Sequence, residues 1–182
     1  MSYFYPEQVA SSYLVDNRFE AFADKDIEMI AYTPSPCRGV SEVKRLQYKN
    51  IKCEKLYHNK LCVYRFPMYK EPKGSIGRLI RYTLCCIKYL YHGLKSKDVD
   101  LVFLSSTPPI MGIVGALIKK WRKIPFVYNL QDIFPDSLIS TGLAKKGGLL
   151  WNIGRKIENF IYHNADTVSY THLRAHETLS DL

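Results

Sequence analysis

Residues 101–109 read LVFLSSTPP, and residues 126–137 read FVYNLQDIFPDS. Each stretch begins with a short apolar run that predicts a strand buried on both faces, and each continues into a polar tract. In an open α/β sheet, ligands bind outside the carboxyl ends of the strands. The two polar tracts therefore mark the expected ligand site, before any chemistry is assigned to it.

The segments around these strands alternate between strand and helix patterns. The helices that apolar periodicity predicts cover residues 8–24, 75–97, 110–117 and 149–164. The predicted strands cover residues 27–33, 99–104 and 126–130, together with a β-hairpin over residues 51–66 that turns at residues 58–60. This order is typical of a Rossmann-like α/β fold with a doubly wound, mostly parallel sheet.

The sequence predicts one domain over residues 1–168, because 182 residues are too few for two large cores. Only residues 2–5 precede the first predicted helix, so the first strand of the sheet is expected to be very short or clipped. Residues 169–182 show neither strand nor helix periodicity, although a further strand is due after Ala165. We expect this tail not to belong to the fold.

The composition is basic, with 26 lysine and arginine residues against 17 aspartate and glutamate residues and a net charge of +9. Such a balance favours an anionic partner, which is nucleic acid, an anionic membrane surface or a phosphate-bearing ligand. The five cysteines show no C-x-x-C spacing, which is typical of reduced thiols in a cytosolic protein rather than of a metal site. Polar residues and prolines interrupt the apolar run 101–118, so no transmembrane helix is expected.

The tract after residue 104 carries the first candidate site. Thr107 followed by Pro108 is a good helix start, with a hydroxyl to cap free amides and a proline ring at helical φ. Unpaired N–H groups at such a start suit a phosphate or a sugar hydroxyl, and Ser105 and Ser106 would line the same cleft. The alternative is an ordinary capped turn between a strand and a helix.

The tract after residue 130 carries the second candidate site. Asp132 can orient a hydroxyl nucleophile or stabilise a developing positive charge, and Gln131 can hydrogen-bond a sugar or phosphate. Asp136 is either a substrate ligand or a first-turn acid that complements the helix dipole. Residues 5–12 contain no glycine, so the dinucleotide-binding fingerprint is absent and an oxidoreductase is disfavoured.

Residues 75–97 and 119–123 combine arginine and lysine with tyrosine and tryptophan. Basic and aromatic side chains on one helix suit an anionic lipid interface or single-stranded nucleic acid. The alternative is a solvated helix face with an apolar inner stripe.

Five phrases carry a family resemblance: residues 3–7 (YFYPE), 32–39 (YTPSPCRG), 105–109 (SSTPP), 126–137 (FVYNLQDIFPDS) and 154–158 (GRKIE). Together they resemble the N-terminal half of a glycosyltransferase family 4 enzyme, of the bacterial subgroup that builds surface polysaccharides. The resemblance implies the GT-B arrangement, in which two Rossmann-like domains face each other across a cleft. In that family the N-terminal domain serves the acceptor, while a C-terminal domain, expected to be missing here, holds the nucleotide sugar.

The resemblance also implies an activity and its partners. A sugar would pass with retention, and without a metal or other cofactor, from a nucleotide-sugar donor to a lipid-linked saccharide acceptor. The protein would be cytoplasmic and peripheral on the inner face of the plasma membrane, docked on an anionic membrane surface. Asp132 and Gln131 are expected at the reaction centre. The substrate-binding residues that we expect are Glu7, Ser11, Ser12, Ser105, Ser106, Thr107 and Asp136.

Two other interpretations stay open. The chain could be a non-catalytic, membrane-docked subunit that binds the acceptor and requires a separate donor-binding chain. A basic nucleic-acid binder agrees with the net charge, but the sequence contains no motif of such a protein, so nucleic acid is not expected as a partner.

Overall fold

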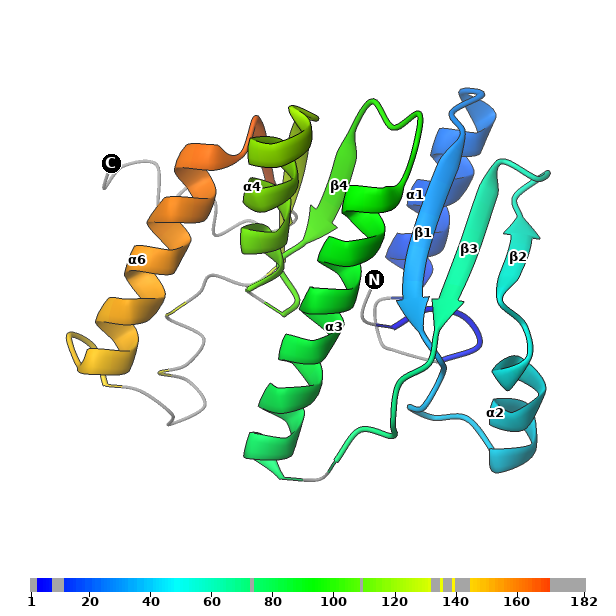
Figure 1. Ribbon diagram of the computed structural model, residues 1–182, viewed down its shortest axis with the longest axis horizontal. Helices are drawn as coiled ribbons and strands as arrows, with labels where there is room; N and C mark the ends of the chain where they lie inside the picture. The colour runs from blue at the N-terminus through cyan, green and yellow to red at the C-terminus, as the bar shows by residue number, and fades with distance from the viewer. Residues whose placement is uncertain are drawn as a thin grey trace. The chain divides into compact units, whose positions relative to one another are not determined.

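The fold is α/β, with parallel strand pairs joined by crossovers that contain helices (Figure 1). The computed structural model describes residues 3–7, 12–72, 74–108, 110–131, 135, 139 and 145–170. The chain divides into two compact units, Met1–Lys88 and Tyr89–Leu182, and the boundary between them falls within helix α3 (Ser75–Lys95). The predicted fold class, a Rossmann-like α/β structure, is confirmed.

The first unit contains a three-stranded sheet with the order β1-β3-β2. β1 pairs parallel to β3, with Met29 opposite Leu61, and β2 pairs antiparallel to β3, so the predicted hairpin is confirmed. The elements of this unit, apart from the first part of α3, are α1 (Ser12–Asp24), β1 (Met29–Pro34), α2 (Glu42–Lys49), β2 (Cys53–Leu56) and β3 (Leu61–Phe66).

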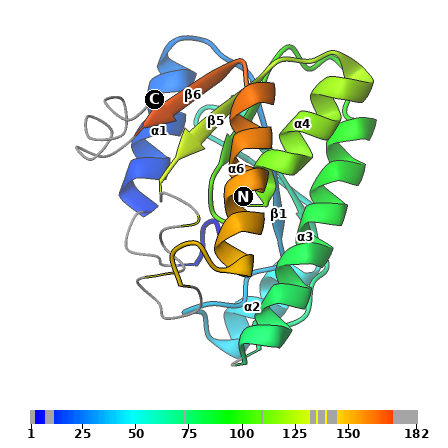
Figure 2. The ribbon, with the colours of Figure 1, turned by 90° about the vertical axis from the view of Figure 1, so that its left-hand side faces the viewer.

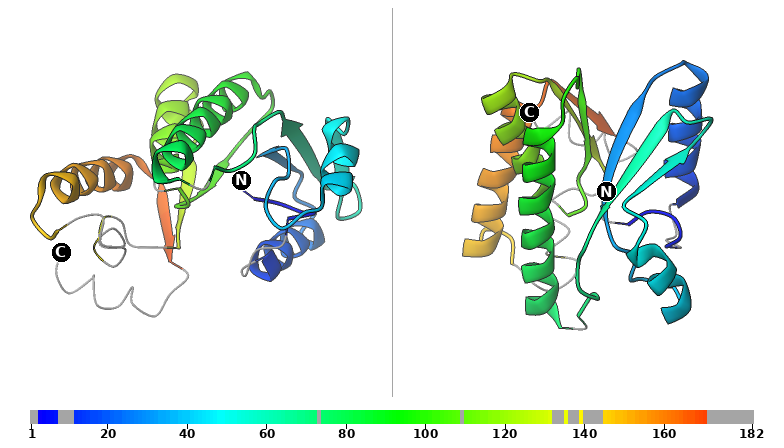
Figure 3. Two further views of the ribbon diagram at one scale, coloured as in Figure 1. Left: turned by 90° about the horizontal axis from the view of Figure 1, so that it is seen from below. Right: turned by 45° about the vertical axis from the view of Figure 1, so that its right-hand side comes forward.

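Helix α1 lies along one face of this sheet (Figure 3), and apolar residues of both form one core. Leu61 and Val63 of β3 are fully buried, and Phe4 is buried with its ring in a T-shaped contact with Phe19 of α1 at 5.8 Å. Residues 3–7 form a turn, and the Glu7 N–H donates to the Phe4 carbonyl at 3.0 Å. Of the two alternatives for the first strand, a very short strand is therefore not present at residues 3–7, and a clipped strand stays a prediction. The N-terminal residues therefore supply a core side chain to the unit.

The second unit contains three parallel strands in the order β4-β5-β6. Helices α4 and α6 belong to the two crossovers and lie side by side (Figure 2). The elements are β4 (Val102–Ser105), α4 (Met111–Arg122), β5 (Phe126–Leu130), α6 (Leu149–Asn164) and β6 (Thr167–Tyr170). Strand β6 begins at Thr167 and pairs with β5 as far as Tyr170, so it includes the first two residues of the tail, where the sequence predicts no strand.

Strand β5 occupies the centre of this sheet. Phe126, Tyr128 and Leu130 are buried, and they join Ile161 of α6 and Ala116 of α4 in one apolar core. A central strand of a parallel sheet is covered on both faces, which explains the nearly continuous apolar run in the sequence.

The start of α4 differs from the prediction. The N-cap position is Ile110, whose side chain makes no capping hydrogen bond, and the first helical residue is Met111. A capping side chain reaches only amides two or three residues further along the chain, so Thr107 is too far from the helix to cap it. The prediction that Thr107 caps this helix was wrong, and its hydroxyl donates to the Gln131 side chain instead. The helix also continues to Arg122, beyond its predicted end at residue 117.

The packing of α4 against α6 requires a glycine at position 112. A Cβ atom on Gly112 would lie 2.4 Å from the Cγ2 atom of Ile161, and Ile161 is only 1% exposed. The side chain of Ile161 is held in the core and has little room to move aside. The two helices can therefore approach this closely only where α4 has no side chain.

We expect Gly112→Ala to lower the urea midpoint of unfolding. Overpacking of a closed core costs about 1–3 kcal/mol, which outweighs the gain of at most about 1 kcal/mol in helix propensity. The measurement is urea denaturation followed by circular dichroism. Gly74→Ala is the matched control, because a Cβ at Gly74 would meet nothing within 4 Å. An unchanged midpoint for Gly112→Ala would contradict the packing described.

Asp166 ties the amino end of β5 to α4 and to the start of β6. Its Oδ1 accepts a hydrogen bond from Lys119 Nζ at 2.8 Å, and its Oδ2 accepts one from the Phe126 N–H at 2.9 Å. The hydrogen bond from Lys119 and, to a smaller extent, that from the Phe126 amide hold the pKa of Asp166 below its ordinary value of 3.8. Both bonds favour the ionised carboxylate.

A lowered pKa makes this contribution to stability depend on pH. It is present in full above the ordinary pKa of the unfolded chain and is lost as the pH falls through the folded pKa. Asp166→Asn should therefore lower the urea midpoint at neutral pH, and its difference from the wild type should shrink below about pH 4. Asp100→Asn, which changes an exposed carboxylate of the same unit, is the control. A difference that stays constant from pH 7 to strongly acidic conditions would refute the role of the carboxylate.

Candidate functional site

The carboxyl ends of β4 and β5 lie next to each other. The parallel register sets Ser105 opposite Asn129, and the Ser106 N–H donates to the Asn129 carbonyl at 2.9 Å. The Gln131 N–H donates to Ser106 Oγ at 2.8 Å, and Thr107 Oγ1 donates to Gln131 Oε1 at 3.1 Å. The structure thus brings together Ser105, Ser106, Thr107 and Gln131, as the two polar tracts predict.

These four side chains differ in what they offer to a ligand. Ser106 is 1% exposed, and its hydroxyl joins the two strand ends. Thr107 is exposed and Gln131 is half-buried, so the polar groups that this edge presents to solvent come mainly from this pair. Asp132 and Asp136 lie outside the described residues, and their expected roles stay predictions.

Asn129 is a residue of this edge that the sequence analysis missed. It is 3% exposed, and its Nδ2 donates to Ser169 Oγ of β6 at 3.4 Å. Its Oδ1 has no hydrogen-bond partner in the part of the chain that the structure describes. A buried amide oxygen without a partner is costly and requires an explanation. The sequence signal was a lone amide inside an otherwise apolar strand.

Glu7 occupies a buried position at the carboxyl end of β1. Its side chain is 4% exposed, and Oε1 accepts hydrogen bonds from the Cys37 and Arg38 amides at 2.8 and 2.9 Å. Oε2 accepts a longer bond from the Phe4 amide at 3.3 Å. Glu7 therefore anchors the loop that follows β1, and its contact with a substrate stays a prediction.

Of the two serines that are predicted to bind substrate together with Glu7, the structure describes only Ser12. Ser12 is the first residue of α1 and is half-buried. Ser11 lies outside the described residues. The structure therefore does not test whether the Ser12 side chain binds a substrate, and this role stays a prediction.

A second polar cluster surrounds Arg81 of α3. Arg81 is fully buried, its Nε donates to the Tyr69 carbonyl, and its Nη2 donates to Cys37 Sγ, both at 3.2 Å. Its Nη1 has no hydrogen-bond partner among the described residues. The sequence analysis read Arg81 as part of a basic helix surface. The structure shows instead that it is an internal group, because it falls on the side of α3 that packs against the loops after β1 and β3.

Tyr3 and Glu71 extend this cluster. The Tyr3 hydroxyl donates to Glu71 Oε2 at 2.9 Å and lies 3.2 Å from the Tyr82 hydroxyl. Burial, followed by these hydrogen bonds, raises the pKa of Tyr3. The exposed guanidinium of Arg38 lies over the Tyr3 ring at 5.3 Å. Tyr3 therefore stays protonated at neutral pH and acts as a hydrogen-bond donor.

The rest of helix α3 exposes an apolar stripe. Its large exposed apolar residues are Ile76, Leu79, Ile80, Leu84, Ile87 and Tyr91. Arg78 and Lys95 are exposed beside the stripe, while Lys88 is half-buried over the Phe66 ring. The predicted combination of basic and apolar groups is present, but this apolar stripe is exposed to solvent, while the buried side of the helix carries Arg81, Cys85, Cys86 and Tyr89.

The cluster of basic residues at 119–123 is partly used within the fold. Lys119 donates to the Asn164 carbonyl and to Asp166, and Arg122 donates to the carbonyls of Gly93 and Ser96. Trp121 is 57% exposed.

The described residues lack two features that would define the kind of site. They contain no helix that is both long and apolar enough to cross a membrane. They also contain no group of three or more His, Cys, Asp or Glu side chains arranged to hold a metal ion.

The chain is similar to a known protein class over about half of its length. No protein-family model matches it. It is 24% identical over 103 residues to the probable glycosyltransferase WbjE of Pseudomonas aeruginosa. The match covers 54% of this chain and 26% of that protein, so the chain corresponds to only part of its relative.

Proposed function

We propose that the chain is the acceptor-side domain of a retaining, metal-independent glycosyltransferase of family 4 and the GT-B class. Its reaction would transfer a sugar from a nucleotide donor to a lipid-linked saccharide in surface polysaccharide biosynthesis. The observation that carries the proposal is the polar edge at the ends of β4 and β5, in a chain similar to a probable glycosyltransferase. In an open α/β sheet, this edge is where ligands bind.

The residues of this edge suit the positioning of an acceptor. During transfer, the acceptor oxygen bonds to the anomeric carbon while the bond from that carbon to the diphosphate breaks, and the proton of the acceptor hydroxyl passes to the departing diphosphate. In our proposal the Asp132 carboxylate accepts a hydrogen bond from the acceptor hydroxyl and stabilises positive charge on the sugar. Gln131, which is held by Thr107 and Ser106, would hydrogen-bond the acceptor or the leaving diphosphate. Asp136 would bind substrate beside them.

The donor would bind to a second domain, as the resemblance implies. The coverage of 26% of the relative's length agrees with a longer parent protein. The alternative is a non-catalytic subunit that binds the acceptor and works with a separate donor-binding chain. The nucleotide sequence around the reading frame separates the two, because a continuing frame that encodes a donor domain favours the enzyme and a neighbouring gene for that domain favours the subunit.

Helix α3 is the part of the chain that we propose to dock on an anionic membrane. A lipid-linked acceptor stays at the membrane, so the acceptor domain must reach the headgroup region. The exposed stripe from Ile76 to Tyr91 offers apolar contact area, and Arg78 and Lys95 offer positive charge beside it. Each basic residue near an anionic leaflet contributes about 1 kcal/mol.

The reaction-centre proposal predicts that Asp132→Asn, in the protein that joins this chain to its donor domain, lowers the transfer rate by about 10²–10⁴-fold. Gln131→Ala should lower it less, because a neutral amide contributes a weaker bond than a carboxylate. Transfer of labelled sugar to the lipid fraction measures both rates. Asp100→Asn, which lies before β4 at the other end of the strand, should leave the rate unchanged. Near-normal transfer by Asp132→Asn would remove this residue from the reaction centre.

The membrane proposal predicts that the chain sediments with vesicles that contain phosphatidylglycerol and that salt releases it, since salt screens surface charge. Replacement of Ile76 and Leu79 by serine should weaken this binding. Val43→Ser on α2 is the matched control, because Val43 is also a strongly exposed apolar residue, at 69% against 78% for Ile76. Binding that depends neither on anionic lipid nor on salt would refute the proposal.

A further inference from the structure

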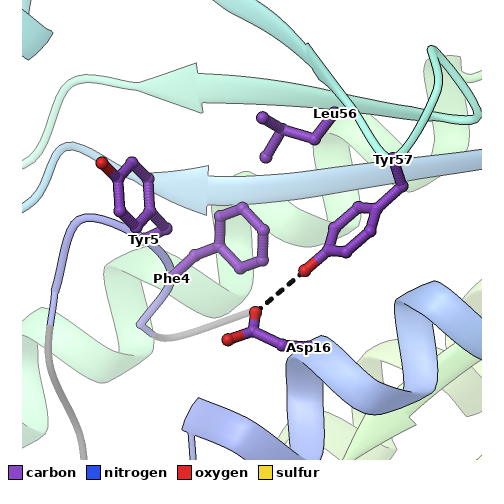
Figure 4. A pocket seen from close by; sticks show the side chains of 5 residues that line it. All are labelled: Phe4, Tyr5, Asp16, Leu56 and Tyr57. Carbon is purple, nitrogen blue, oxygen red and sulfur yellow. Dashed lines mark hydrogen bonds between the residues drawn. The ribbon is translucent and has the colours of Figure 1, made fainter.

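The first unit contains a pocket next to helix α1. Its lining comes from three segments and comprises Phe4, Tyr5, Asp16, Leu56 and Tyr57 (Figure 4). Its volume of about 300 Å³ is at the lower end of the range for sites that bind small molecules. The pocket therefore has room for a single small ring, not for an extended nucleotide.

The walls of the pocket are mostly aromatic, and the core of the unit holds them in place. The Phe4 ring is 5% exposed and packs edge-on against Phe19, whose ring centroid lies 5.9 Å from that of Tyr57. Phe4 and Phe19 thus support the wall from behind, and the rings that a ligand can reach are those of Tyr5, which is 54% exposed, and of the half-buried Tyr57. Although a sugar is polar, the face of its ring that carries C–H groups can lie flat against aromatic rings.

One hydrogen-bonded pair supplies the polar side of the pocket. The Tyr57 hydroxyl donates to Asp16 Oδ1 at 2.9 Å (Figure 4). Burial and, to a smaller extent, this hydrogen bond raise the pKa of Tyr57. The phenol therefore remains a hydrogen-bond donor, and it orients the Asp16 carboxylate. Asp16 is exposed, and a carboxylate offers more acceptor sites than this one bond uses. It can therefore accept a hydrogen bond from a ligand hydroxyl.

The backbone conformation at Tyr57 is also unusual, as is common at ligand sites. Tyr57, His58 and Asn59 all have positive φ angles, of 49°, 55° and 67°. A bulky residue in the left-handed region costs about 1–2 kcal/mol, and such conformations cluster at ligand sites. This turn directs the Tyr57 ring toward Asp16 (Figure 4).

The charges around the pocket select against ions of either sign. Lys44 Nζ lies 5.5 Å from the centre of the Tyr5 ring, and Arg65 Nη2 donates to the Tyr5 carbonyl at 2.6 Å. The Lys44 ammonium disfavours a cation on that side, because like charges repel. The charge of Arg65 is compensated by Glu54, whose Oε2 lies 3.0 Å from Arg65 Nη2. The carboxylate of Asp16, and that of Glu20, which also raises the pKa of Tyr57, disfavour a phosphate or another anion. An uncharged ligand with hydroxyl groups avoids both penalties.

We propose that this pocket binds one uncharged pyranose ring, with a C–H face against the aromatic wall and a hydroxyl donating to Asp16. The inference rests on the proposed function for its biological use, since a sugar-transferring protein has a saccharide acceptor to hold. It goes beyond that proposal by assigning a saccharide contact to α1 and the β2–β3 turn. None of the residues expected from the sequence lines this pocket.

The test is binding of two probes, methyl glucopyranoside and methyl N-acetylglucosaminide, to the 182-residue chain, measured by saturation-transfer NMR. We expect saturation transfer to ring protons of at least one probe. Asp16→Asn should weaken that binding about tenfold, because hydrogen bonds to charged acceptors are the stronger ones. Tyr57→Phe should weaken it less, since the ring stays and only the group that orients Asp16 is lost.

Asp24→Asn is the matched control, because it changes another exposed carboxylate on the same helix and should leave binding unchanged. The urea midpoint of each variant checks the fold, and neither Asp16→Asn nor Tyr57→Phe removes core volume. Absence of saturation transfer, or equal affinity of Asp16→Asn and the wild type, would overturn the inference. Preferential binding of tetramethylammonium or inorganic phosphate would also overturn it, because the pocket would then select an ion.

These outcomes can be told apart from failure of the proposed function. The binding measurement needs neither a donor nor a membrane, so it can succeed in a chain that transfers no sugar. A transferase whose activity depends on Asp132 but whose chain binds no pyranoside would keep the proposed function and lose this pocket.

Discussion

The parallel pairing of β4 with β5 is the interaction on which the candidate site depends. Because Ser105 lies opposite Asn129, the two strands end at the same level and their polar tracts meet. Thr107 and Gln131 are 24 residues apart in sequence, yet their side chains share a hydrogen bond. The buried hydroxyl of Ser106 holds the second contact between the strand ends. The apolar core between β5 and helices α4 and α6 keeps this register in place, since a slip by one residue would move Phe126, Tyr128 and Leu130 to the other face of the sheet.

Part of the positive charge of this chain is used inside the fold. Arg65 and Arg81 are both buried, and Arg65 stacks on the Tyr48 ring at 4.7 Å and pairs with Glu54. Lys119 and Arg122 bond to carbonyls that end or follow helices. These contacts use part of the donors of each cationic group within the fold, while Arg65 Nε, Arg65 Nη1 and Arg81 Nη1 have no hydrogen-bond partner among the described residues. The net charge of +9 therefore overstates the charge that a membrane would meet.

Helices α3 and α4 differ in how far their apolar side chains are buried. Six residues of α4 are buried, among them Gly112 and Gly115, whose lack of side chains lets the helix approach Ile161 and Phe126. Helix α3 is longer, and a full stripe of its large apolar side chains faces solvent. Exposed apolar patches of this kind mark surfaces that interact with a partner. This difference, more than the number of basic residues, is why we propose α3 as the segment that docks on a membrane.

The sequence by itself determined the α/β class, the hairpin, the strands around residues 102–105 and 126–130, and the bounds of α3 and α6 to within two residues. It did not predict α2, and it placed the start of α1 and the end of α4 several residues away from where they lie. It could do so because strand and helix periodicities are local properties of the chain. It also located the polar edge after β4 and β5, since strand ends follow directly from the strands. Only the tertiary structure decided that Thr107 bonds to Gln131 and not to a helix start, and that Glu7 and Arg81 are internal. Those outcomes depend on partners from distant segments, and periodicity reports which face of an element is buried but not what lies against it.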